Sequence, residues 1–148
     1  TMTWDDVAEM IELWGGEFCL KGVMSQEDAI KAKELGATGI VVSNHGGRQL
    51  DGSRAPFDQL QEIVDAVGDD IDVIMDSGIQ RSSHVLKALA AGAKAVGGGR
   101  FYLYALAAAG QAGVERALEI MRTEIERNMR LMGVSKISEL NRNHLRYR

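Results

Sequence analysis

The sequence is poor in cysteine, proline and aromatic residues: its 148 residues include one cysteine and one proline, and 5% are aromatic. A single cysteine excludes a disulfide within the chain. Because Cys19 lies in the apolar run Phe18–Leu20, we expect a buried structural thiol and a reducing compartment. A composition of 45% hydrophobic and 26% charged residues is unlike that of disordered chains. It predicts one globular domain over residues 1–148.

The sequence also has fewer basic than acidic residues. The 17 Lys and Arg residues are outnumbered by 21 Asp and Glu residues, which gives a formal net charge of −4. This balance excludes the strong positive field with which proteins bind nucleic acids. No apolar run approaches the roughly 18 residues of a membrane-spanning helix, and the first residues do not resemble a signal peptide. We therefore expect no nucleic-acid partner and a cytoplasmic location, with peripheral association at the inner membrane left open.

Apolar segments of strand length alternate with helical patterns along the first hundred residues. Helices are expected after the caps Thr3 and Ser25. From Phe101 onward the chain is expected to be helical again, with a long amphipathic stretch from Gln111 to Met132 before Gly133. The other predicted elements are strands over 18–23, 39–43, 72–76 and 94–98, and helices over 57–67 and, after a cap at Ser82 or Ser83, 84–91.

This alternation predicts an α/β fold with a parallel sheet and right-handed crossovers. Two architectures fit it, a doubly wound sheet and part of a (β/α)8 barrel; a complete barrel has eight strands and about 250 residues. The strands contain nearly continuous apolar runs, such as 40–42 and 73–75. Such runs predict strands that are covered on both faces.

Polar residues and glycines follow each predicted strand, at the sheet edge where α/β proteins place their active sites. His45 lies between an asparagine and two glycines, and an imidazole titrates near pH 6.5 in its unperturbed state, as a general base requires. Arg48 offers a fork of donors that matches a carboxylate. Together they favour a substrate acid with a reactive carbon beside its carboxyl group.

The glycine-rich ends 76–79 and 97–100 let backbone amides approach an anion, and barrels often bind phosphate after their last two strands. These two segments together, with Arg100 as the balancing charge, predict a phosphate site. Lys21 ends the first strand. Either it stabilises an anionic cofactor or intermediate, or it forms an internal salt bridge to an acid such as Asp76.

The segment Ser43–Gln49, with the sequence SNHGGRQ, resembles the signature of FMN-dependent α-hydroxy acid oxidising enzymes. This family includes glycolate oxidase, lactate oxidase, mandelate dehydrogenase and L-lactate dehydrogenases. The resemblance extends from Trp4 to about Leu145. It implies that the chain is the C-terminal half of a (β/α)8 barrel, strands five to eight, followed by C-terminal helices.

The resemblance also implies a role for each residue of the site. His45 would be the base and Arg48 the ligand of the substrate carboxylate. Lys21 and Ser43 would contact the flavin ring, Asp76 the ribityl chain, and Ser77, Gly78, Gly99 and Arg100 the phosphate of FMN. One departure is Gln80, where the family usually has arginine, so the phosphate site loses a charge unless Arg81 or Arg100 compensates.

The function implied is FMN-dependent oxidation of a small, lactate-like L-2-hydroxy acid to the 2-keto acid, with oxygen, a quinone or a cytochrome as electron acceptor. The alternative is an inactive half-barrel that acts as an anion-binding or assembly module. A third reading, another phosphate-binding barrel such as an isomerase, fits the histidine motif less well. Unpaired strand edges predict a homo-oligomer or a companion N-terminal half.

Overall fold

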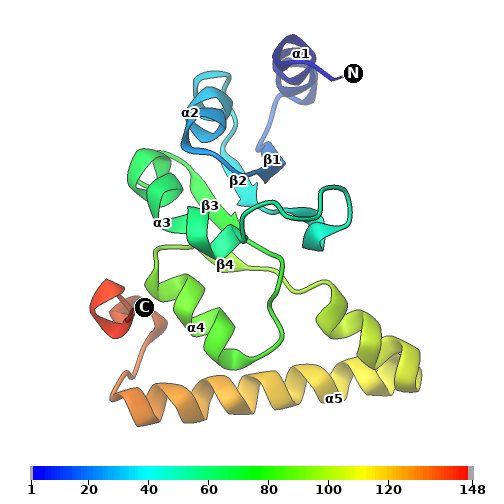
Figure 1. Ribbon diagram of the computed structural model, residues 1–148, viewed down its shortest axis with the longest axis vertical. Helices are drawn as coiled ribbons and strands as arrows, with labels where there is room; N and C mark the ends of the chain where they lie inside the picture. Colours follow the sequence, from blue (N-terminus) through cyan, green and yellow to red (C-terminus); the bar gives the residue numbers. More distant parts are fainter. Residues whose placement is uncertain (1, 147–148) are drawn as a thin grey trace.

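The computed structural model describes residues 2–146 and contains one parallel sheet of four strands in the order β1-β2-β3-β4. Figure 1 shows helices α2 and α3 beside the sheet and the long helix α5 at the far end of the molecule from α1. The strands are β1 (Cys19–Val23), β2 (Gly39–Val42), β3 (Asp72–Met75) and β4 (Ala95–Val96). The helices are α1 (Trp4–Trp14), α2 (Gln26–Glu34), α3 (Pro56–Val67), α4 (Ser82–Ala90) and α5 (Arg100–Met132). Short 3-10 turns are η1 (His45–Gly47), η2 (Ile137–Glu139) and η3 (Arg142–His144).

The strand order decides between the two predicted architectures. Each strand pairs with the next one along the chain, whereas a doubly wound sheet reverses its order at a switch point. The buried strand residues Ile40 and Val73 belong to one core cluster with Ala29 of α2, Leu60 of α3 and Ala88 of α4. Since the helices cover the same face of the sheet, the fold is that of a segment of a (β/α) barrel.

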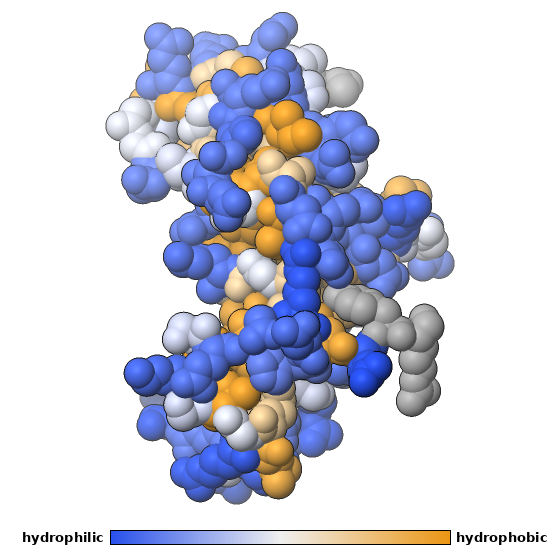
Figure 2. Space-filling view, turned by 90° about the vertical axis from the view of Figure 1, so that its left-hand side faces the viewer, coloured by the Kyte–Doolittle hydropathy of each residue, from blue (hydrophilic) through white to orange (hydrophobic). Residues whose placement is uncertain are grey.

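The outer surface of this helical layer is mostly hydrophilic, as Figure 2 shows for the side of the molecule that carries α2 and α3. The apolar positions of α3 face the sheet instead, and Leu60, Ile63 and Val67 are buried. Each helix therefore has one solvated face and one apolar face against the strands.

Helices cover one face of the sheet, whereas the second face is only partly covered within residues 2–146. Side chains alternate between the two faces of a strand, and Val41 and Ile74 on the second face are only half-buried, while Ala95 is exposed. Cys19 lies on this second face of an edge strand and is exposed, which corrects the expected buried thiol. Partial burial of the sulfur and the carboxylate of Asp72 both raise the pKa of this thiol.

The first two helices begin where the sequence predicts. The Thr3 side chain accepts a hydrogen bond from the Asp6 N–H in a capping box, and the Ser25 side chain accepts one from Asp28. Helix α4 differs: it begins at Ser82 after Arg81, whose side chain makes no cap bond, and the Ser82 N–H donates to Oε2 of Glu124 on α5 at 3.4 Å. The Ser82 hydroxyl accepts a hydrogen bond from Asn128 of α5, at 2.7 Å.

Two further boundaries differ from prediction. The fourth strand has only two residues, because the glycine run 97–99 provides no side chains to pack on the sheet. Helix α5 begins at Arg100, one residue before the helical segment expected from Phe101, and continues to Met132 with a kink where Ala109 and Gly110 leave helical geometry. Among residues 2–146, no helix is both long enough and apolar enough to cross a membrane.

Gly92 and Gly133 follow helices α4 and α5 and both have positive φ, +111° and +71°, so the pair can be used to test the packing. A Cβ at Gly92 would lie 2.6 Å from Cγ1 of Val64, whereas a Cβ at Gly133 meets nothing within 4 Å. We expect Gly133→Ala to cost about 1 kcal/mol through backbone strain alone. Gly92→Ala should cost roughly 1–3 kcal/mol more through overpacking, as measured by denaturant unfolding. Equal losses would show that α3 and α4 do not pack as described.

Candidate active site

Lys21 connects the carboxyl ends of three strands. Its Nζ donates to Oγ of Ser43 at 2.8 Å and forms an ion pair with Oδ2 of Asp76 at 2.5 Å. The internal salt bridge that the sequence left open is therefore present. Ser43 is buried, and its hydroxyl also accepts from the His45 N–H at 3.1 Å and hydrogen-bonds Asp76. Both acceptor positions of the hydroxyl are thus used, by Lys21 and by the His45 N–H.

The environment of Asp76 stabilises its charged form. Partial burial alone would raise the pKa of its carboxyl group, but hydrogen bonds from Lys21, Ser43 and Ser77 and the charge of Lys21 outweigh burial and lower the pKa below its ordinary value. The Ser77 hydroxyl donates to the other carboxylate oxygen, Oδ1, at 2.9 Å. Asp76 is therefore a carboxylate at neutral pH, with both oxygens held in place.

The segment after β2 is a tight turn that presents His45 and Arg48 to solvent. The side chain of Asn44 accepts a hydrogen bond from the Gly46 N–H at 3.0 Å, which is the Asx turn typical of asparagine before glycines. His45 adopts φ +54°, a left-handed conformation that is uncommon outside glycine. Within residues 2–146, the exposed Arg48 side chain makes no hydrogen bond or ion pair, so its donors are available to a ligand.

The ring of His45 packs over Gly22. A Cβ at position 22 would lie 3.0 Å from Nε2 of His45, and Gly22 has φ +97° where the register between β1 and β2 shifts. A larger residue at Gly22 would displace the imidazole. This glycine of the Lys21-Gly22 pair is therefore part of the site, through a contact between neighbouring strand ends.

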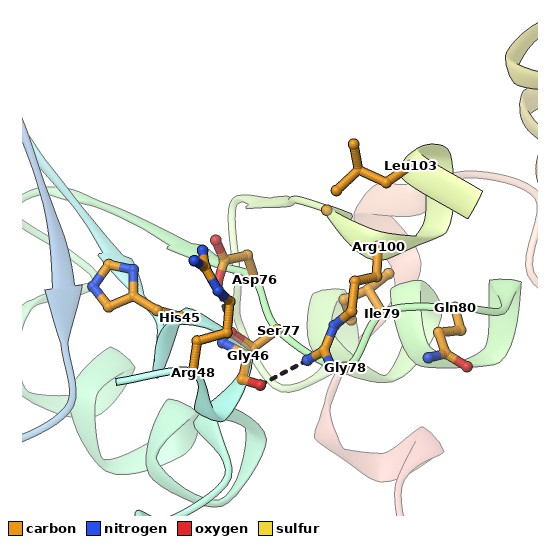
Figure 3. Close-up of a pocket in the computed structure, with 11 residues that line it drawn as sticks. His45, Gly46, Arg48, Asp76, Ser77, Gly78, Ile79, Gln80, Arg100 and Leu103 are labelled. Carbon is orange, nitrogen blue, oxygen red and sulfur yellow. Dashed lines mark hydrogen bonds between the residues drawn. The ribbon is translucent and has the colours of Figure 1, made fainter. Parts of the chain in front are cut away.

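A cavity of about 200 Å³ lies beside this turn (Figure 3). Figure 3 shows His45 and Arg48 at one end and Arg100 at the other, with Asp76 and Ser77 between them. The residues that line it are His45, Gly46, Arg48, Asp76, Ser77, Gly78, Ile79, Gln80, Gly99, Arg100 and Leu103. Seven of the nine residues predicted for the site therefore meet in one cavity. Lys21 and Ser43 do not line the cavity; Lys21 bonds both Asp76, which does line it, and Ser43.

The glycine end of this cavity fits the phosphate of FMN. A Cβ at Gly78 or Gly99 would meet nothing within 4 Å, so both backbones border open space. No hydrogen bond within residues 2–146 uses the N–H of either glycine, which leaves both donors for an anion. Gly99 also precedes α5, and the N-terminus of a long helix attracts negative charge.

Arg100, not Arg81, supplies the charge that Gln80 lacks. Arg81 forms a two-pronged ion pair with Glu124 of α5, at 2.5 and 3.1 Å, and is not among the residues that line the cavity. Arg100 lines the cavity and donates to the carbonyl oxygen of Gly46 at 2.7 Å. The sequence did not predict Gly46 or Leu103 as site residues. Asn44 before two glycines was the available signal for Gly46.

The Lys21–Asp76 pair allows a test of how the strand ends are held together. The lowered pKa of Asp76 stabilises the fold above the unfolded value near 3.9, and this stabilisation is lost as the pH falls through the lower folded value. We expect Asp76→Asn to cost about 1 kcal/mol at pH 7, since Lys21 is 48% exposed, and the difference from wild type to shrink below about pH 4.

Denaturant unfolding over a series of pH values measures this difference. Asp70→Asn, which removes the more exposed partner of Lys33, is the matched control and should cost less. A loss at Asp76 that stayed constant to pH 3 would contradict the assignment of its charge.

The chain matches the family model described as FMN-dependent dehydrogenase over residues 1–147. It is 48% identical over 145 residues to the L-lactate dehydrogenase (cytochrome) of Saccharomyces cerevisiae, covering 95% of this chain and 24% of that protein. It is 49% identical over 138 residues to the pre-mycofactocin synthase of Mycobacterium tuberculosis, covering 93% of this chain and 35% of that protein. The chain therefore spans about a quarter to a third of the length of these relatives.

Solved structures agree with the sequence comparison. A variant of flavocytochrome b2 with bound sulfite superposes with a TM-score of 0.91 at 47% identity, over 97% of this chain and 38% of that one. A soluble variant of the membrane-associated (S)-mandelate dehydrogenase from Pseudomonas putida gives a TM-score of 0.95 at 38% identity, over 99% of this chain and 41% of that one. The segment of a (β/α) barrel with His45, Arg48 and Arg100 around one cavity thus belongs to the FMN-dependent dehydrogenase family.

Proposed function

We propose that this chain carries the base, the carboxylate ligand and the phosphate site of an FMN-dependent enzyme that oxidises a small L-2-hydroxy acid to the 2-keto acid. The observation that carries the proposal is the shared cavity, which has His45 and Arg48 at one end and Arg100 at the other. A lactate-like substrate is part of the proposal, because the similar yeast protein is an L-lactate dehydrogenase. The electron acceptor is oxygen, a quinone or a cytochrome.

In this mechanism, Arg48 binds the substrate carboxylate through its unpaired donors and orients the α-carbon. His45 takes a proton from the bound acid, and the packing of its ring over Gly22 fixes the direction from which it acts. FMN, when bound, supplies the acceptor for the two electrons that leave the α-carbon. Arg100 and the N–H groups of Gly78 and Gly99 hold the cofactor's phosphate.

The remaining predicted residues act at the flavin ring and the ribityl chain. Lys21 would supply a positive charge toward the flavin ring, where a cation would favour acceptance of electrons by the cofactor. Asp76, whose carboxylate accepts from Ser77, would hold the ribityl chain. Ser43 is occupied by Lys21, His45 and Asp76, so a bond from its hydroxyl to the flavin requires one of these contacts to open.

We further propose that β1 to β4 are strands five to eight of a barrel and that residues 1–148 form its C-terminal half. Support comes from the position of the phosphate site at the ends of β3 and β4, since barrels frequently build this site after strands seven and eight. The alternative function, an inactive module that binds anions or assembles with another chain, is favoured by one observation. The second face of the sheet is partly exposed, with Val41 and Ile74 only half-buried.

His45 tests the catalytic proposal most simply. In the complete enzyme, His45→Gln should lower kcat by about 10²–10⁴-fold, because a general base contributes that much to the rate. The flavin content should not change, since His45 does not contact the phosphate end of the cavity. Turnover with lactate, glycolate and mandelate is measured next to His144→Gln on the distant η3, for which kcat should be retained. Near-normal kcat in His45→Gln refutes the assignment of the base.

Arg48 tests the substrate class. Arg48→Lys should raise KM and lower kcat together, because one ammonium group cannot replace a two-pronged guanidinium on a carboxylate. Arg54→Lys is the matched control, since Arg54 lies in the same loop and bonds Gln59 outside the cavity. Steady-state kinetics with a 2-hydroxy acid gives both constants. Unchanged kinetics in Arg48→Lys would exclude a carboxylate at this position.

The partly exposed sheet face and the free edges of β1 and β4 predict that the chain alone self-associates, or pairs with a fragment that supplies the other strands. Several hundred Å² of exposed apolar surface would cost on the order of 10 kcal/mol at about 25 cal/mol per Å². Light scattering on the purified chain, with mass spectrometry to detect a bound fragment, measures the state. A compact monomer over a wide concentration range contradicts this prediction.

A further inference from the structure

The peptide groups beside His45 are held by residues from two other loops. The Gly46 N–H is shared between Oδ1 of Asn44, at 3.0 Å within the turn, and Oγ of Ser77, at 3.1 Å. The Gly46 carbonyl accepts from Nη2 of Arg100 at 2.7 Å. Ser77 follows β3 and lines the cavity next to Gly78, and Arg100 begins α5 and is assigned to the cofactor's phosphate by the proposed function. The turn that carries the base is therefore attached on both sides of Gly46 to the phosphate site.

Gly46 and the guanidinium of Arg100 are in close contact, so a side chain at position 46 would displace Arg100. A Cβ at Gly46 would lie 2.5 Å from Nη2 and 3.2 Å from Cζ of Arg100. Gly46 also has φ +70°, which disfavours any other residue independently of the space. The guanidinium group thus packs against the backbone of the turn and hydrogen-bonds it at the same place.

His45 depends on these contacts for its orientation. Its own backbone is left-handed, at φ +54°, a conformation that costs a non-glycine residue about 1–2 kcal/mol and persists only when its surroundings impose it. The Ser43 hydroxyl holds the His45 N–H at 3.1 Å, and the Gly46 contacts hold the next peptide. Movement of Arg100 would therefore be transmitted to the imidazole through one residue.

Arg100 has donors for two partners. A guanidinium carries five N–H donors, and within residues 2–146 the Arg100 side chain uses only Nη2, on Gly46. The remaining donors lie in the cavity beside Gly78 and Gly99. We propose, on the basis of the proposed function, that Arg100 is a positioning residue for His45: binding of the cofactor's phosphate fixes its guanidinium, and the guanidinium fixes the turn that directs the base.

Inorganic phosphate tests this coupling, because it occupies the anion site without the ring-current effects of a flavin. In a ¹⁵N NMR titration of the full chain, phosphate should shift the amide signals of Gly78 and Gly99 directly. It should also shift those of Gly46 and Gly47 and the imidazole C–H signals of His45, through Arg100. At saturating phosphate, Arg100→Lys should keep the direct shifts and lose the transmitted ones, since an ammonium group cannot bind both partners as the fork does.

Arg48→Lys is the matched control, because it makes the same substitution in the same cavity without a bond to Gly46, and it should retain the transmitted shifts. Arg100→Gln provides a second variant if Arg100→Lys does not fold. Direct shifts without transmitted ones in the wild type, or transmitted shifts that persist in Arg100→Lys, overturn the coupling and leave the proposed function intact. If phosphate moves no amide signal, the proposed phosphate site fails, and the inference fails with it.

Discussion

The ammonium group of Lys21 is the contact on which the geometry of the site depends. It joins the ends of β1, β2 and β3 through Ser43 and Asp76, which are 22 and 55 residues away in the sequence. In a parallel sheet these ends lie at one edge, where no backbone ladder continues beyond the last pair, so side chains must hold the loops that follow. The buried Ser43 extends the connection to the His45 backbone, and Ser77 extends it to Gly46. A single charge thereby aligns the base with the phosphate site.

Backbone strain is concentrated at this edge. The two non-glycine residues with positive φ within residues 2–146 are His45 and Ser77, and each follows a strand and adjoins the cavity. Such conformations cost of order 1–3 kcal/mol each and persist at functional sites because neighbouring contacts impose them. The core below them, around Ile40, Leu60 and Val73, is fully buried and supplies the stability that offsets this cost.

The sequence predicted features that depend on neighbouring residues and missed those that depend on distant ones. The caps Thr3 and Ser25 bond within three residues, and both helices begin where they indicate. Ser82 also reads as a cap, but its hydroxyl bonds Asn128, 46 residues away. Seven of the site residues predicted from the strand-end motifs and the resemblance meet in one cavity. The exposure of Cys19, in contrast, depends on which elements cover the second face of the sheet, and local periodicity does not indicate this. The contact of Arg100 with Gly46 likewise spans 54 residues.

We propose that the cavity beside His45 binds FMN by its phosphate, with Arg100 as the principal cation. Flavin fluorescence titrations with FMN and with riboflavin, which differ only in the phosphate group, test it most directly. Charge-assisted hydrogen bonds contribute about 1.5–3 kcal/mol each, so the wild-type chain should bind FMN at least about tenfold more tightly than riboflavin. Arg100→Gln should remove most of that difference. Equal affinities of the wild-type chain for FMN and riboflavin would contradict the account.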